Sequence, residues 1–169
     1  ICDPQLVAGR LVGQLIGAQQ QANTLVARME KCISTIKTAV QGKTPPSVYM
    51  ELDYTTPGKP YTVGKGSFEN ELITDAGGAN IFAGDTSGFG YPQVSDETVI
   101  ADNPQVIILS EPLTSSFTKP QDRPAWKSVS AVQNSRIFVV NDDLLSRPGP
   151  RIVAGLAAVA EDLWPSIFS

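Results

Sequence analysis

The chain has 169 residues, with an apolar content of 41% and a charged content of 18%, values that are ordinary for a single globular α/β domain. Its 13 basic and 17 acidic residues give a net charge of -4, which argues against nucleic acid or an anionic membrane surface as a partner. No apolar run approaches the roughly 20 residues that span a bilayer. The chain has no histidine, which removes the commonest general base and the commonest metal ligand. Two cysteines alone make no metal site.

Residues 1–43 are predicted to form a helical hairpin. The segments 4–16 and 20–41 both have helical spacing, and Gly17 interrupts the pattern where two antiparallel helices would bend. In the second segment the apolar positions form one stripe, made of Leu25, Met29, Cys32, Ile33, Ile36 and Val40.

The predicted hairpin would also bring the two cysteines level with each other. Cys2 and Cys32 are equally distant along the chain from Gly17, and antiparallel helices rise equally per residue. They either form a disulfide, which suits an oxidising, extracytoplasmic location, or Cys32 is a small core residue and Cys2 a frayed end. Both alternatives stay open.

Residues 44–169 are predicted to form an α/β unit with a mostly parallel sheet flanked by helices. Strand patterns alternate with helix patterns, as in folds whose parallel strands are joined by helices. Strands are expected at 47–53, 80–83, 106–109 and 136–140, and helices at 66–76, 95–101, 124–131 and 150–163. The segments 106–109 and 136–140 are predicted as buried strands. Sheets of this kind bind ligands at the carboxyl ends of their strands, where the loops near Tyr54 and Asn141 begin.

Three loop motifs occur in a fixed order, at 60–73, 91–97 and 141–151. Each places an aromatic or charged residue on a Gly/Pro-rich loop ahead of a predicted helix start. Together they resemble the C-terminal lobe of the periplasmic substrate-binding proteins that serve ABC importers of cobalamin, ferric siderophores and haem. The resemblance extends from the opening helix to Phe168. It implies a Rossmann-like lobe, with the N-terminal lobe missing from this chain and residues 3–16 as the end of the spine helix that joins the lobes.

The resemblance also implies site residues. Tyr61 and Tyr91 match aromatic positions that press against a large flat ligand; the alternative is local packing against neighbouring prolines. Asp143 and Arg147 match charged residues that meet the ligand's periphery; the alternative is an exposed ion pair worth under about 1 kcal/mol. Glu97 matches an exposed glutamate that docks into an arginine pocket of the transporter's membrane subunits, and an acid in a first helical turn also favours the helix dipole.

Other prominent side chains are predicted to be structural. Glu69 and Glu71 are expected on a solvated helix face. Trp126 and Trp164 fit core or rim positions of amphipathic helices.

These matches predict the substrate-binding component of an ABC importer, which catalyses no reaction and carries no cofactor. Corrinoid is the favoured ligand, because the aromatic-plus-edge arrangement matches the cobalamin-binding members; a ferric siderophore is next and haem third. The chelate holds its own metal, so protein metal ligands are not expected. The expected location is periplasmic or extracellular, with a lipoprotein anchor on the intact protein as one alternative. An isolated lobe exposes its cleft wall, which favours pairing with a second copy.

Two other functions stay open. A small α/β enzyme domain would have to use Ser67, Ser95 or a carboxylate pair, although no base or orienting third group accompanies them. A structural or interaction module would use the helical hairpin, bind no chelate and leave Glu97 dispensable.

Overall fold

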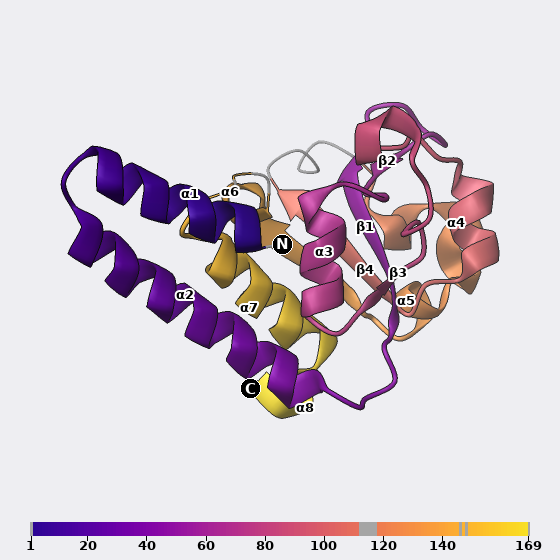
Figure 1. Cartoon of the computed structure of the whole chain (residues 1–169). Coiled ribbons are helices and arrows are strands. Elements are labelled where there is room, and N and C mark those ends of the chain that lie inside the picture. Colours follow the sequence, from indigo (N-terminus) through magenta and orange to yellow (C-terminus); the bar gives the residue numbers. More distant parts are fainter. Residues whose placement is uncertain (1, 112–117, 146, 148, 169) are drawn as a thin grey trace.

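The computed structural model places a sheet between two helical layers, with a helical hairpin beside it (Figure 1). It describes residues 2–111, 118–145, 147 and 149–168, and the side chains of all of these except 2–5 and 111. The strands are β1 (Ser47–Asp53), β2 (Tyr61–Thr62), β3 (Ala79–Asn80), β4 (Val106–Glu111) and β5 (Ile137–Asn141). The helices are α1 (Cys2–Leu15), α2 (Gln19–Val40), α3 (Phe68–Asp75), α4 (Asp96–Asp102), α5 (Ser130–Gln133), α6 (Asp142–Leu145), α7 (Ile152–Leu163) and α8 (Pro165–Phe168), with 3-10 helices η1 (Ser87–Gly90), η2 (Pro120–Asp122) and η3 (Pro124–Ser128).

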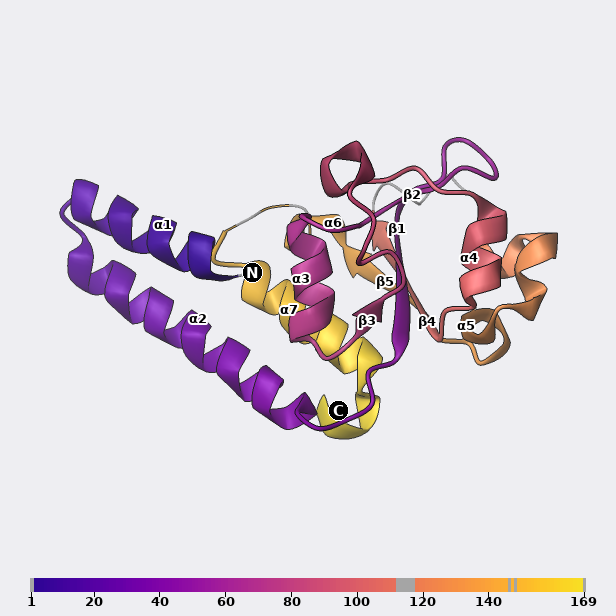
Figure 2. The same ribbon diagram turned by 45° about the vertical axis from the view of Figure 1, so that its right-hand side comes forward.

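Helices α1 and α2 form the predicted antiparallel hairpin. Gly17 takes a φ of 72°, a left-handed conformation that glycine adopts without strain. At Gly13 an added Cβ would collide with the side chain of Ala22, so the glycine lets the two helices approach closely near the turn. From the turn the helices diverge, as both views show (Figure 1, Figure 2).

The apolar stripe of α2 differs from the prediction by one position at its start. Leu25 is 42% exposed, because α1 approaches α2 on the side of Val26, where Gly9 leaves room. The buried positions of α2 are Val26, Met29, Ile36 and Val40. Cys32 is half-buried and has no disulfide partner among the side chains that the structure describes; the side chain of Cys2 lies outside them, so the pairing of the two cysteines stays a prediction.

The sheet has the strand order β2-β1-β4-β5, and β3 pairs with the start of β1. Strands β1, β4 and β5 run parallel, with Met50 opposite Ile108 and Ile108 opposite Phe138. The short β2, which the sequence did not indicate, is antiparallel to β1 and pairs Tyr61 with Asp53. The carboxyl ends of the parallel strands therefore meet at one edge of the sheet, called the carboxyl edge below. It is formed by Asp53, Glu111 and Asn141.

Alternate residues of the central strands are buried on opposite faces of the sheet. Val48, Met50 and Ile108 pack in one core with α2, α3 and α7. Tyr49 and Ile107 pack in a second core with α4, η3 and α5. All five side chains are fully buried, which explains why segment 106–109 is continuously apolar and confirms its prediction as a buried strand.

Three predicted elements differ in the structure. The strand expected at 80–83 is only the two-residue β3, because the chain turns directly after it, with the amide of Ala83 donating to the carbonyl of Asn80 at 3.2 Å. The expected helix at 124–131 divides into η3 and α5, because Val129 between them is extended and fully buried in the second core. The strand predicted as buried at 136–140 is instead the last in the sheet order, and its Val139 is 52% exposed. An apolar run does not by itself reveal that a strand lies at a sheet edge.

Candidate functional site

Strand β2 places Tyr61 at one end of the carboxyl edge. Tyr61 pairs with Asp53 of β1 on one side and forms an isolated antiparallel bridge to Gln93 on the other. The phenol is 41% exposed. The bridge brings the segment 91–93 alongside β2, so the structure places the two predicted tyrosines on neighbouring antiparallel segments.

Tyr91 follows η1 and contacts a buried carboxyl group. Its hydroxyl donates to Oε2 of Glu69 at 3.1 Å. Glu69 lies in the first turn of α3 and is 2% exposed, so the prediction of a solvated helix face was wrong for this residue. Burial raises the pKa of Glu69 to about 7, and the negative charge of Asp142 adds to the rise. Burial, and then the charge of Glu69, raise the pKa of Tyr91 to about 12.

Asp143 and Arg147 lie at the opposite end of the carboxyl edge, after β5. The side chain of Asn141 accepts a hydrogen bond from the Asp143 amide at 2.8 Å, which fixes the start of α6 directly after the strand. Arg147 Nε lies 2.9 Å from Asp143 Oδ1, and the two side chains are 70% and 46% exposed respectively. This arrangement fits both the predicted ligand role and the alternative of an exposed ion pair.

Phe89, in η1, was not identified from the sequence. Its side chain is 99% exposed and its backbone has a φ of 56°. The left-handed conformation costs a residue other than glycine roughly 1–2 kcal/mol, and such strain occurs at functional sites. The Gly-Phe-Gly sequence at 88–90 is the signal that could have indicated it, because two glycines flank an aromatic residue in a loop.

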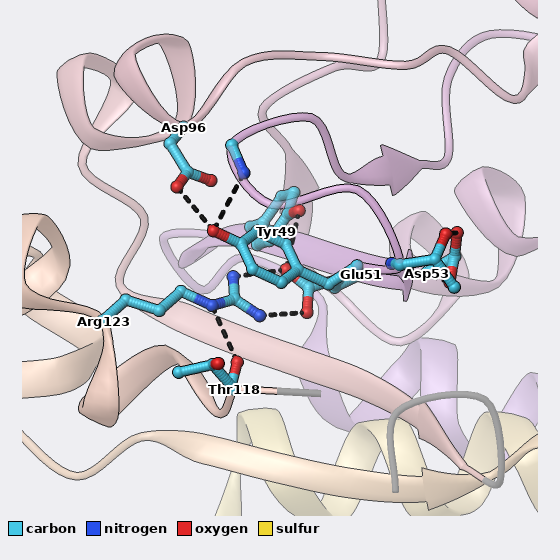
Figure 3. A network of polar contacts seen from close by, with 9 residues as sticks. Tyr49, Glu51, Asp53, Asp96, Thr118 and Arg123 are labelled. Carbon is cyan, nitrogen blue, oxygen red and sulfur yellow. Dashed lines mark hydrogen bonds and ion pairs between the residues drawn. The ribbon is translucent and has the colours of Figure 1, made fainter. Parts of the chain in front are cut away.

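A buried ion pair joins β1 to the loop that carries η2 and η3 (Figure 3). Arg123 donates from its two terminal nitrogens to Glu51 at 2.7 Å each, and from Nε to the carbonyl of Thr118 at 2.9 Å. Arg123 is 4% and Glu51 1% exposed. Burial raises the pKa of Glu51, while the hydrogen bonds from Arg123 oppose that rise. The two-pronged geometry is the one that a guanidinium forms with a carboxylate.

Aromatic rings enclose this ion pair and connect it to α4. The guanidinium carbon of Arg123 lies 3.3 Å from the ring centroid of Tyr54 and 4.6 Å from that of Trp126. The Tyr54 hydroxyl donates to Oδ2 of Asp96, the first residue of α4, at 2.8 Å. Sequence reasoning missed this network, because Glu51 occupies a strand position and Arg123 a loop position with nothing local to relate them.

Glu97 is exposed in the first turn of α4. Ser95 begins this helix by accepting a hydrogen bond from the Thr98 amide at 3.2 Å. The amide of Glu97 itself and the Ser95 side chain lower the pKa of Glu97, so its carboxylate is charged at neutral pH. Ser67 begins α3 in the same way, accepting from the Asn70 amide at 3.2 Å. Both serines therefore act as helix caps.

An apolar groove of about 680 Å³ runs along the hairpin. Residues of both helices line it, among them Val12, Ile16, Leu25 and Met29. Leu15 and Ile16, at the turn, are 85% and 71% exposed.

Within the ranges that the structure describes, no three His, Cys, Asp or Glu side chains are grouped so that they could hold a metal ion. In the same part of the chain, no helix has the length and apolarity needed to cross a membrane.

Comparisons with known proteins agree on one family. Residues 8–144 match the family model described as periplasmic binding protein. An uncharacterized ABC transporter substrate-binding lipoprotein of Bacillus subtilis, YvrC, is 28% identical over 162 residues, which cover 94% of this chain and 49% of that protein. A vitamin B12-binding protein of Vibrio cholerae is 38% identical over 99 residues, or 58% of this chain and 34% of that protein. The crystal structure of a possible iron-binding (periplasmic solute-binding) protein from Staphylococcus epidermidis superposes with a TM-score of 0.80 and 30% identity, over 96% of this chain and 62% of that one. The chain thus spans about half, or less, of the length of these two sequence relatives.

Proposed function

The chain belongs to the periplasmic binding protein family, and from this premise we propose that it forms one lobe of the substrate-binding component of an ABC importer. The observation that carries the proposal is the carboxyl edge, which has Tyr61 and Tyr91 partly exposed at one end and the exposed Asp143–Arg147 pair at the other. Aromatic faces beside a charged edge suit a large flat ligand with a polar periphery. In this proposal the lobe binds and delivers a ligand and catalyses no reaction, which the capping roles of the two candidate serines support.

A corrinoid is the ligand that we favour. The Vibrio cholerae relative, which is 38% identical over the matched part, is named as a vitamin B12-binding protein. A ferric siderophore is the second candidate, and the structural similarity to a possible iron-binding protein of Staphylococcus epidermidis supports it. Haem is the third. In each case the metal arrives within its chelate, so the lobe needs no metal ligands of its own.

Glu97 is proposed to dock the loaded protein onto arginine residues of the transporter's membrane subunits. The side chain is exposed, its lowered pKa keeps it charged, and the cap at Ser95 fixes the helix turn that carries it. The proposed location is outside the cytoplasmic membrane, either free or held by a lipid anchor on the intact protein. The name of the Bacillus subtilis relative as a lipoprotein supports this location.

Equilibrium dialysis of the intact gene product against cobalamin, a ferric hydroxamate siderophore and haem tests the ligand. We expect selective retention of cobalamin, and Tyr91→Ala should weaken binding by roughly 1–3 kcal/mol, as for a buried aromatic anchor. Retention of none of the three chelates would contradict the proposed function.

Glu97→Ala tests the docking role. The variant should retain the chelate with unchanged affinity, yet support less uptake and bind less to the reconstituted transporter. Glu71→Ala, an exposed acid on a different helix, serves as the control and should leave uptake unchanged. Normal uptake with Glu97→Ala would contradict the docking role and leave Glu97 only its favourable interaction with the helix dipole.

A further inference from the structure

Glu69 and Tyr91 meet because their two loops are joined through the backbone. The amide of Gly64, before α3, donates to the carbonyl of Gly90 at 2.8 Å. Gly90 takes a φ of 93°, and a Cβ added there would lie 2.7 Å from the amide nitrogen of Ser67. A glycine is therefore needed for the loops to approach so closely. As a result, the residue after Gly90 lies against the first turn of α3.

The side chains determine which part of Tyr91 faces solvent. The hydroxyl donates to Glu69 at 3.1 Å, and Glu69 is 2% exposed, whereas Tyr91 as a whole is 36% exposed. Because the hydroxyl is directed to a buried carboxyl group, the exposed part of the side chain consists mainly of the ring.

We propose that Glu69 is a positioning residue of the ligand site, which holds the Tyr91 hydroxyl inward so that the ring face, and not the hydroxyl, meets the ligand. This inference deepens the proposed function and rests on it, since the ligand role of Tyr91 belongs to that proposal. It specifies the ligand surface that this position recognises, namely a flat or apolar face. A ligand group that accepts hydrogen bonds would find no donor from Tyr91.

The charges around Glu69 make the contact measurable. Among the described residues, Tyr91 bonds to its carboxyl from the loop after η1, and the charge of Asp142, in α6, acts on it. Asp142 is itself held by Ser110, whose hydroxyl donates to it at 2.7 Å. Burial and Asp142 raise the pKa of Glu69 to about 7, while the hydrogen bond from Tyr91 lowers it. Removal of the Tyr91 hydroxyl should therefore raise the pKa of Glu69 above about 7.

The first experiment uses the chain without ligand. Carbon-13 NMR follows the titration of the side-chain carboxyl groups, and Glu69→Gln assigns the signal that disappears. Tyr91→Phe should shift the Glu69 titration to higher pH, and Glu71→Gln, on the same helix but exposed, should leave it unchanged. An unchanged Glu69 titration in Tyr91→Phe would overturn the contact.

The second experiment measures chelate affinity of the intact protein, with cobalamin, a ferric hydroxamate siderophore and haem as probes. Glu69→Leu removes the acceptor, whereas Glu69→Gln keeps an oxygen that can accept. We expect Glu69→Leu to bind roughly three- to tenfold more weakly, the range for loss of one hydrogen bond, without a fall in its thermal midpoint. Glu69→Gln should retain the affinity. Tyr91→Phe removes the donor of the same hydrogen bond, and its chelate affinity should fall by about as much as that of Glu69→Leu.

The outcomes separate the two proposals. If Tyr91→Ala weakens binding while Glu69→Leu and Tyr91→Phe bind like the unmodified protein, the positioning role is overturned and the proposed function stands. An affinity loss that follows thermal stability across the variants also overturns positioning, since it indicates a structural role alone. If the unmodified protein retains no probe, the proposed function fails, and with it the ligand part of the inference; the NMR experiment then decides the Glu69–Tyr91 contact by itself.

Discussion

Glu69 places an ionisable carboxyl group where water scarcely reaches it. Burial raises its pKa from 4.5 to about 7, so the folded protein binds this proton more tightly than the unfolded chain. The contribution of Glu69 to stability is therefore fully present below about pH 4.5 and is lost as the pH rises through about 7.

Glu69→Gln should remove this pH dependence. Relative to the unmodified protein, its free energy of unfolding should rise by about 3 kcal/mol between about pH 4.5 and pH 8, since each pKa unit corresponds to about 1.4 kcal/mol. Urea denaturation at a series of pH values measures the difference. Asp162, whose pKa is raised to about 6 by burial and by Glu161, titrates in the same window in both proteins and cancels. A constant difference across the series would show that Glu69 is not buried in solution.

At the level of single residues, the sequence predicts the environment of a side chain only where the residues next to it in the chain determine that environment. Tyr61 and Tyr91 stand next to prolines in the loop motifs that the sequence singled out. Both are partly exposed, although Tyr61 lies in the short strand β2, and their ligand role stays a prediction. Glu69 could not be identified in this way, because an acid in a first helical turn is favourable whether or not another loop covers it. Its burial depends on Gly90, whose loop folds over it from a distant part of the chain.

At the scale of the structural elements, the Arg123–Glu51 ion pair joins β1 to the loop that carries η2 and η3. Through Tyr54, which packs on Arg123, it is also connected to α4. Arg123→Met should lower the free energy of unfolding by about 3–5 kcal/mol, because it leaves the charge of Glu51 buried without a partner. The double variant Arg123→Met, Glu51→Met should recover most of this loss. Arg147→Ala is the exposed counterpart and should cost under about 1 kcal/mol.

Chemical denaturation of the four proteins measures these differences. Equal losses for the single and double Arg123 variants would contradict this prediction, because removal of Glu51 would then relieve no penalty from an unpaired charge. The loss would instead belong to the contacts of Arg123 itself, among them its packing on Tyr54 and Trp126.

The sequence predicts elements well where their signals are local. The strand at 47–53 and the starts of α3 and α4 were predicted closely, since an apolar run and a capping serine act within a few residues. Strand β2 was missed because two residues carry no periodicity, and it exists only through pairing with β1. The break between η3 and α5 was missed because it results from burial of Val129 against other elements.

At the scale of the whole molecule, the hairpin leaves apolar surface uncovered. Leu11 and Leu15 are 53% and 85% exposed on α1, one turn apart. We expect the isolated chain to self-associate through this face, since exposed apolar patches of this kind mark contact surfaces. Sedimentation velocity over a range of concentrations should show a rising average mass, and the double variant Leu11→Gln, Leu15→Gln should stay monomeric with unchanged circular dichroism. A monomer at every concentration of the unmodified chain would contradict this.

The separation of the two tryptophans gives the chain a pair of natural optical reporters. Trp126 is fully buried beside the guanidinium of Arg123, with its ring centroid 5.8 Å from that of Tyr49, whereas the indole of Trp164 donates to the carbonyl of Ala76 at 3.0 Å on the α3 side. A positive charge near an indole shifts its emission. In a Trp164→Phe background the remaining fluorescence therefore comes from the network that touches α4. A shift in the emission wavelength of Trp126 when a chelate is added would report, without any attached dye, whether the helix that carries Glu97 responds to ligand binding.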